Sequence, residues 1–168
     1  TFHLVVPGPG ALPGLVFASP CHIKKWNMEI EALTPYTHRI RFALNGKQTQ
    51  HFLLLSDIHW DNPKCDRKTL TRHLEQAKDI GAPILIFGDL FCAMQGKYDP
   101  RTSKNSVRAE HQVNNYLDAL VDTAAEFFRP YPVLFISPGN HETAILRRQE
   151  TDLTQRLADT LGCKAEIG

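Results

Sequence analysis

Three short apolar runs dominate the hydrophobic pattern of this chain, and each run ends abruptly in polar residues. They cover residues 52–55, 83–87 and 131–136. Runs of this length and composition, bounded by polar and turn-forming residues, predict buried strands. Stretches in which apolar residues recur with helical spacing separate the runs. The alternation of strand and helix predicts an α/β fold with a mixed sheet and βαβ units.

A first helix is predicted between the first two runs. Asp66 can cap its start, and Gly81 can end it. Its buried face is predicted from four apolar residues with helical spacing, namely Leu70, Leu74, Ala77 and Ile80. Because a crossover through such a helix is right-handed, the strands on either side should be parallel.

A second helix is predicted over about residues 105–129, and Pro130 should end it. Its apolar stripe comprises Val113, Leu117, Leu120, Val121, Ala124 and Phe128. The third strand should therefore also be parallel. Beyond residue 141, leucines at positions 146, 153, 157 and 161 predict further helix in two pieces.

The N-terminal part of the chain reads differently. Residues 1–36 are rich in proline and glycine and are predicted to form an irregular lead-in. Residues 37–168 are predicted to form the functional domain. Asn45-Gly46 is a favoured pair for a tight turn, so a β-hairpin is predicted at about residues 38–56.

Composition and charge narrow the class of protein only slightly. The 168 residues are 42% hydrophobic, which suits one globular domain, and a net charge of +1 gives no general attraction to nucleic acid. The four cysteines form no Cys-x-x-Cys pair, which favours a reducing, cytoplasmic location. No apolar stretch is long enough to span a bilayer, so no membrane association is expected. The chain begins at Thr1 and ends soon after a helical pattern, so we expect it to be cut at both ends.

Side chains with metal-ligand chemistry follow all three predicted strands. Asp57 and His59 follow the first, Asp89 follows the second, and Asn140 and His141 follow the third. Because ligands bind at the carboxyl ends of the strands in open α/β sheets, these side chains should converge. Each motif alone is weak, but no structural need explains all three together. Carboxylate, amide and imidazole groups suit Mn²⁺, Fe or Zn²⁺.

The three motifs resemble those of a known family. Asp57-x-His59, Gly88-Asp89 and Gly139-Asn140-His141-Glu142 are similar to the first three motifs of the calcineurin-like metallophosphoesterase superfamily, and residues 88–97 are similar to its phage and bacterial members. The resemblance covers the chain from about residue 48 onward. It implies a fold that is the first half of an α/β/β/α sandwich.

The resemblance also implies a reaction and a role for each residue. Asp57 and His59 would bind a first divalent metal ion, Asp89 would bridge two ions, and Asn140 would bind the second. His141 would act as the acid or stabilise developing charge. The ions, with manganese expected before iron or zinc, would activate water to hydrolyse a phosphoester substrate, with nucleic acid and nucleotides among the candidates. The oligomeric state is left open.

This chain departs from the family pattern at two places. Cys92 stands where many members carry an aspartate that pairs with the histidine of the third motif, which disfavours the phosphoprotein phosphatases. No histidine follows His141, although the resemblance implies later histidine ligands. We therefore expect weak metal binding and a chain that is a fragment of a longer enzyme. The alternative is a degenerate, non-catalytic phosphoesterase-like module that binds a partner. Glu142 is expected to be only a first-turn helix acid.

Overall fold

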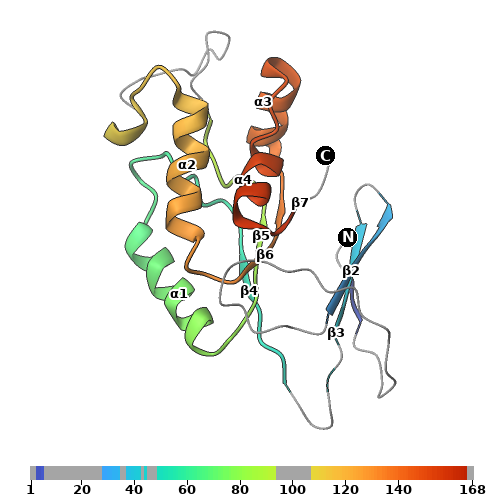
Figure 1. The fold of residues 1–168 in the computed structure, drawn as a ribbon. Coiled ribbons are helices and arrows are strands. Elements are labelled where there is room, and N and C mark those ends of the chain that lie inside the picture. Colours follow the sequence, from blue (N-terminus) through green and yellow to red (C-terminus); the bar gives the residue numbers. More distant parts are fainter. Residues whose placement is uncertain are drawn as a thin grey trace.

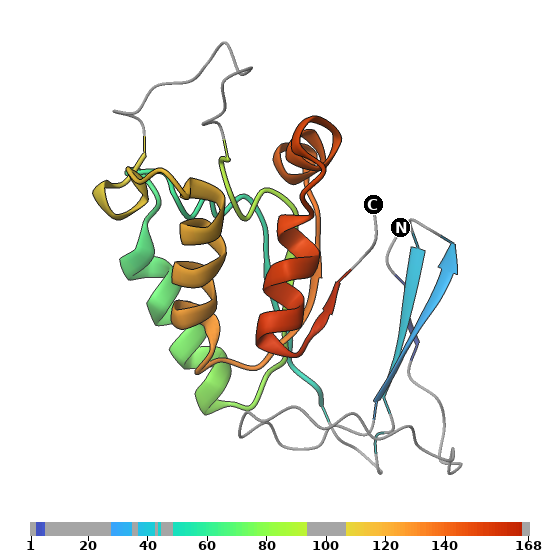
Figure 2. The ribbon, with the colours of Figure 1, turned by 45° about the horizontal axis from the view of Figure 1, so that its top comes forward.

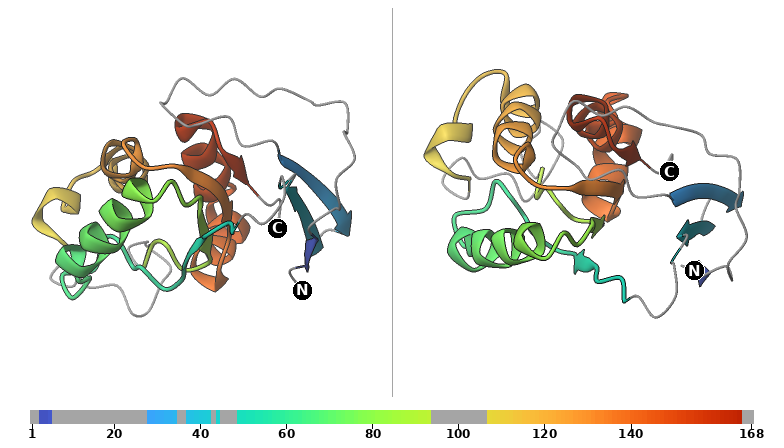
Figure 3. Two further views of the ribbon diagram at one scale, coloured as in Figure 1. Left: turned by 90° about the horizontal axis from the view of Figure 1, so that it is seen from below. Right: turned by 60° about the horizontal axis from the view of Figure 1, so that its bottom comes forward.

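A four-stranded sheet positions the predicted site, and the other elements pack on its two faces. The computed structural model describes residues 3–5, 28–34, 37–42, 44, 49–93 and 107–165. Helices α1 (Arg67–Asp79), α2 (Tyr116–Phe128) and α4 (Leu153–Leu161) cover one face of this sheet, and a three-stranded sheet packs against the other (Figures 1 and 2). Two further views show the same layers from other sides (Figure 3). The predicted α/β fold with a mixed strand arrangement is confirmed.

The four-stranded sheet is parallel throughout and has the order β4-β5-β6-β7. Its strands are β4 (Leu53–Leu55), β5 (Ile84–Phe87), β6 (Val133–Ser137) and β7 (Lys164–Ala165). The first three are the predicted strands. The short strand β7 was not predicted.

The described helices alternate with these strands. They are α1 (Arg67–Asp79), the short 3-10 helix η2 (Ala109–His111), α2 (Tyr116–Phe128), α3 (Asn140–Gln149) and α4 (Leu153–Leu161). Helix α1 links β4 to β5, and α2 links β5 to β6, so both predicted βαβ units are present. The prediction of two helical pieces after residue 141 is also confirmed. No helix in these described ranges has the length and apolar character needed to cross a membrane.

Helix α1 forms largely as its sequence predicts. The Asp66 carboxylate accepts a hydrogen bond from the Thr69 N–H at 3.0 Å, and Gly81 follows the helix with φ +67°. Three of the four predicted face residues are buried, namely Leu70, Leu74 and Ala77. The fourth, Ile80, is 59% exposed and lies just beyond the last residue of the helix.

Helix α2 starts at Tyr116, so the prediction of a helix from residue 105 is wrong at its beginning. Val113, assigned to the buried stripe, is 45% exposed. The preceding segment is held by the loop after β4 instead. The Arg108 backbone N–H donates to the Asp61 carbonyl, and its guanidinium donates to the carbonyls of Asn62 and Cys65.

The three-stranded sheet corrects two predictions about the N-terminal part. Its strands β1 (His3–Val5), β2 (Met28–Thr34) and β3 (Thr37–Phe42) have the order β1-β3-β2. The prediction of an irregular lead-in over residues 1–36 is therefore wrong for the residues that form β1 and β2. The hairpin at residues 38–56 is also wrong, because β3 pairs with β1 and β2 whereas β4 pairs with β5. The turn residues Asn45 and Gly46 lie outside the described part.

Two apolar clusters explain why the strand sequences are apolar at successive positions. Ile84 and Ile86 face the helices, whereas Leu85 faces the three-stranded sheet, where it packs in one cluster with Ile40 and Phe42. A strand that is buried on both faces needs no polar alternation. The layered packing fixes the strands, and the strands fix the loops at their carboxyl ends.

Candidate metal centre

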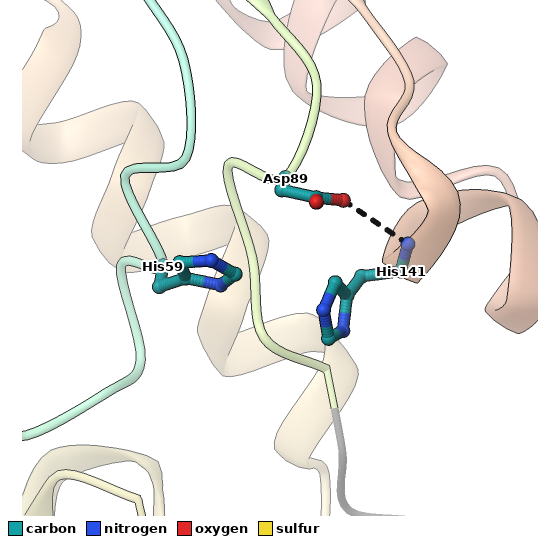
Figure 4. A group of neighbouring side chains, drawn as sticks. All are labelled: His59, Asp89 and His141. Carbon is teal, nitrogen blue, oxygen red and sulfur yellow. Dashed lines mark hydrogen bonds between the residues drawn. The ribbon is translucent and has the colours of Figure 1, made fainter.

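Three side chains with metal-ligand chemistry meet beyond the carboxyl ends of β4, β5 and β6 (Figure 4). His59 lies in the loop after β4, Asp89 lies in the loop after β5, and His141 is the second residue of α3. Each offers one ligand atom, and these three atoms lie within 4.8 Å of one another. The two imidazole rings stand edge to face with their centroids 5.2 Å apart. The predicted convergence of the three strand ends therefore occurs, and the donor set suits a divalent transition metal.

The other two predicted ligands lie at the edge of this cluster. Asp57 is exposed, and its backbone N–H donates to the Gly88 carbonyl at 3.2 Å, which places it beside the start of the loop after β5. Asn140 is the first residue of α3 and is also exposed. Asp57 is not part of the three-residue cluster. The ligand roles of both residues stay predictions.

The backbone at the site adopts conformations that side chains disfavour. Asp57, His59 and Asp89 have φ values of 53°, 49° and 48°, in the left-handed region. Such a conformation costs about 1 kcal/mol for each non-glycine residue. Hydrogen bonds between the loops after β4 and β5 offset this cost, since the N–H groups of His59 and Trp60 donate to the carbonyls of Asp89 and Leu90. Strain of this kind is commonly found at functional sites.

The glycines of the second and third motifs allow the two loops to touch. A Cβ atom on Gly139 would lie 2.1 Å from the Asp89 Oδ1 atom and 2.3 Å from the Asp89 backbone nitrogen. A Cβ atom on Gly88 would lie 2.9 Å from the Gly139 Cα atom, and Gly88 has φ +70°. The sequence Gly-Asp and Gly-Asn-His is thus explained by close approach of the backbones.

His141 is oriented by two contacts with the loop after β5. Its backbone N–H donates to the Asp89 Oδ1 atom at 3.2 Å (Figure 4). Its Nδ1 atom lies 2.7 Å from the Cys92 carbonyl oxygen. Since a carbonyl oxygen only accepts, Nδ1 must carry the proton in this hydrogen bond, which leaves Nε2 for the site. The resemblance led us to expect an aspartate at position 92 as the partner of this histidine; the partner here is the backbone carbonyl of Cys92.

His59 contacts the Cys92 side chain. Its Nδ1 atom lies 3.3 Å from the Cys92 Sγ atom, to which the Asn62 side-chain amide also donates at 3.3 Å. Burial raises the pKa of the Cys92 thiol to about 11, partly offset by the hydrogen bond from Asn62. For His59 to bind a metal through Nε2, its Nδ1 must carry the proton and donate to sulfur. Cys92 therefore contacts both histidines, a role that its residue type did not indicate.

Two buried carboxylates next to the site were not predicted to serve it. Asp61 lies two residues after His59, and Glu142 directly follows His141. Glu142 carried a signal as part of the third motif, but only its position in the first helical turn was interpreted. Nothing in the sequence distinguished Asp61 from an ordinary loop acid.

Comparison with known proteins gives one match. A family model described as calcineurin-like phosphoesterase matches residues 50–165, which is more than half of the chain and contains every residue of the cluster. Neither a curated protein nor a solved structure matches.

Proposed function

Because the chain belongs to the calcineurin-like phosphoesterase family, we propose that it hydrolyses a phosphoester with the aid of two divalent metal ions, preferably manganese. The meeting of His59, Asp89 and His141 is the observation that carries this proposal. When bound, the ions would polarise phosphoryl oxygens and lower the pKa of a water molecule that attacks phosphorus. The chain's own residues would hold the ions, orient one another and supply a proton.

The carboxylate of Asp89 is the proposed bridge between the two ions. One of its oxygen atoms lies within 4.8 Å of a nitrogen atom of each imidazole, and its Oδ1 atom accepts a hydrogen bond from the His141 N–H. We assign His59 and Asp57 to the first ion and Asn140 to the second. Asp57 and Asn140 are exposed beside the cluster, so neither side chain is enclosed by packing.

His141 is the proposed acid. With Nδ1 hydrogen-bonded to the Cys92 carbonyl, Nε2 is the atom that can hold a proton for the leaving oxygen. His141 is also a member of the ligand cluster, so its imidazole stands where it can stabilise developing charge.

The proposed substrate class is a phosphoester, and the site alone does not select among nucleic acids, nucleotides and smaller esters. A cytoplasmic location is proposed, since Cys65, Cys92 and Cys163 are free thiols. A non-catalytic binding module is the second candidate. It is favoured by one observation, the absence of any histidine after His141, which limits the number of ligands this chain can offer.

Titration with Mn²⁺, followed by the electron paramagnetic resonance of the free ion, tests the proposal. Wild type should bind Mn²⁺ weakly, and Asp89→Asn and His59→Ala should each weaken binding about tenfold or more. The matched control is His51→Ala, because His51 is exposed and lies outside the cluster. Hydrolysis of bis-p-nitrophenyl phosphate with Mn²⁺ would support catalysis. Binding without hydrolysis would favour the non-catalytic module, and equal binding by all variants would refute the metal site.

A further inference from the structure

A five-residue segment of the loop after β5, residues 89–93, is held by two carboxylates. Residues 89–93 form no helix or strand, yet four of their backbone N–H groups donate to buried acidic side chains. We propose that Glu142 and Asp61 are positioning residues, which hold this loop in the shape that presents Asp89 and the Cys92 carbonyl to the two histidines. The inference rests on the proposed metal site, because it assigns these carboxylates to that site's support.

Glu142 ties the loop after β5 to the loop after β6. Its side chain is 3% exposed. The Oε1 atom accepts from the Phe91 N–H at 2.8 Å, and the Oε2 atom accepts from the N–H groups of Asp89 at 3.2 Å and Gly139 at 2.8 Å. One carboxylate thus fixes both Asp89, the proposed bridging ligand, and Gly139, which directly precedes Asn140.

Asp61 holds the second half of the same loop. Its side chain is fully buried. The Oδ1 atom accepts from the Cys92 N–H at 2.6 Å, and the Oδ2 atom accepts from the Ala93 N–H at 3.2 Å and from the Tyr116 hydroxyl of α2. Asp61 therefore determines where the carbonyl and thiol of Cys92 lie, and these groups contact His141 and His59.

The energetics explain why carboxylates specify one shape for this loop. Asp89 and Ala93 both have left-handed φ values, 48° and 45°, so the loop is strained at both ends. Burying a carboxylate is costly unless hydrogen bonds replace its water. Here the loop's own N–H groups replace that water, and they do so with Asp89 and Ala93 in the strained conformation. Relaxing the loop would remove two backbone donors from each buried carboxylate, so the cost of losing these hydrogen bonds opposes the relief of strain and favours the observed conformation.

The variants Glu142→Gln and Asp61→Asn keep side-chain size and replace one acceptor oxygen by an amide donor. In each case an amide group would face a backbone N–H, so that hydrogen bond is lost. The matched controls are Glu126→Gln and Asp122→Asn, the same exchanges at exposed positions of α2. We expect each test variant to bind Mn²⁺ about 10- to 100-fold more weakly than its control at a temperature where both are folded.

A second measurement needs no metal. In the metal-free protein, the ¹H–¹⁵N signals of Asp89 and His141 should move in Glu142→Gln, and the imidazole ¹⁵N signals of His141 should move in Asp61→Asn. A merely structural role would lower the melting temperature and leave both these signals and the Mn²⁺ affinity at control values. That result would overturn the inference.

The outcomes separate this inference from the proposed function. If wild type binds no Mn²⁺, the proposed function fails, and the signals of the metal-free protein still decide whether the carboxylates position Asp89 and His141. If a test variant does not fold, wild type alone decides through amide hydrogen exchange. Mn²⁺ should then slow exchange at Asp89, Phe91 and Cys92, because coupling between loop and metal is reciprocal. Exchange at these amides that is unaffected by bound Mn²⁺ would overturn the inference.

Discussion

Replacing Gly139 by alanine would separate two loops that now touch. Gly139 has φ −98° and ψ −168°, an extended conformation that alanine adopts without cost. The entire effect must therefore come from the added methyl group. That group would lie 2.3 Å from the backbone nitrogen of Asp89, an atom that cannot rotate away.

The size of the effect follows from this distance. Restoring an ordinary contact requires the Gly139 and Asp89 backbones to move apart by about 1 Å. Overpacking of this kind costs about 1–3 kcal/mol in the free energy of unfolding, and each kcal/mol lowers Tm by about 2–4 °C in a chain of this length. The same displacement separates Asp89 from His141, so we expect Mn²⁺ affinity to fall at least about tenfold.

The matched control is Gly81→Ala. A methyl group there would meet no atom within 4 Å, but Gly81 has φ +67°, so alanine should cost about 1–2 kcal/mol through backbone strain alone. Thermal unfolding by circular dichroism and Mn²⁺ titration should therefore show similar stability losses in both variants and weakened metal binding in Gly139→Ala only. Wild-type Mn²⁺ affinity in Gly139→Ala would refute the explanation of the motif glycine by close approach.

Two further predictions concern the core. Burial lowers the pKa of His111, whose Nδ1 atom has no hydrogen-bond partner among the described residues, so the unfolded chain binds the proton more readily. The stability that neutral His111 contributes should be complete above about pH 6.5 and be lost as pH falls below that value. In urea unfolding, the free energy of unfolding of His111→Gln should therefore decline less steeply than that of wild type as pH falls below about 6.5. An equally steep decline would contradict this role of His111. Leu157→Ala, at a fully buried position of α4, should lower the free energy of unfolding by about 2–5 kcal/mol. The control Leu54→Ala, at a position 63% exposed, should change it by less than about 0.5 kcal/mol. Similar losses for both variants in urea unfolding would show that α4 is not part of the core.

Local sequence signals predicted the elements that they control directly. The cap at Asp66 and the stop at Gly81 fix helix α1 within the chain itself, so its bounds were predictable. Strand β5 was predictable because a short apolar run between a proline and a glycine has few alternative secondary structures. Each of these features depends on neighbours in sequence, and the sequence supplies them.

Features set by distant partners were predicted wrongly. Asn45-Gly46 favours a turn, but it carries no information about which strand pairs with β3, and the partners are β1 and β2. The start of α2 was placed too early because Val113 fits a helical stripe, whereas the contacts of Arg108 with the loop after β4 draw that segment away.

The candidate site shows the same division. The convergence of His59, Asp89 and His141 could be predicted from residue types, because imidazole and carboxylate side chains are themselves the groups that bind metal. The partner of His141 Nδ1 is a backbone carbonyl, which every residue possesses, so no residue type could have indicated Cys92 for that role. Asp61 was missed for a related reason, because its hydrogen-bond partners, the Tyr116 hydroxyl and two backbone N–H groups of the loop after β5, are distant in the sequence.

Because Asp57, His59 and Asp89 have left-handed conformations, selection for stability and selection for function should favour different residues at these positions. Glycine adopts that conformation more easily, so glycine at any of these positions would relieve strain while removing a candidate ligand. A directed-evolution screen that rewards heat resistance alone would thus tend to recover variants in which the metal centre has been lost. A screen for catalysis would have to retain the strain and gain its stability elsewhere in the fold.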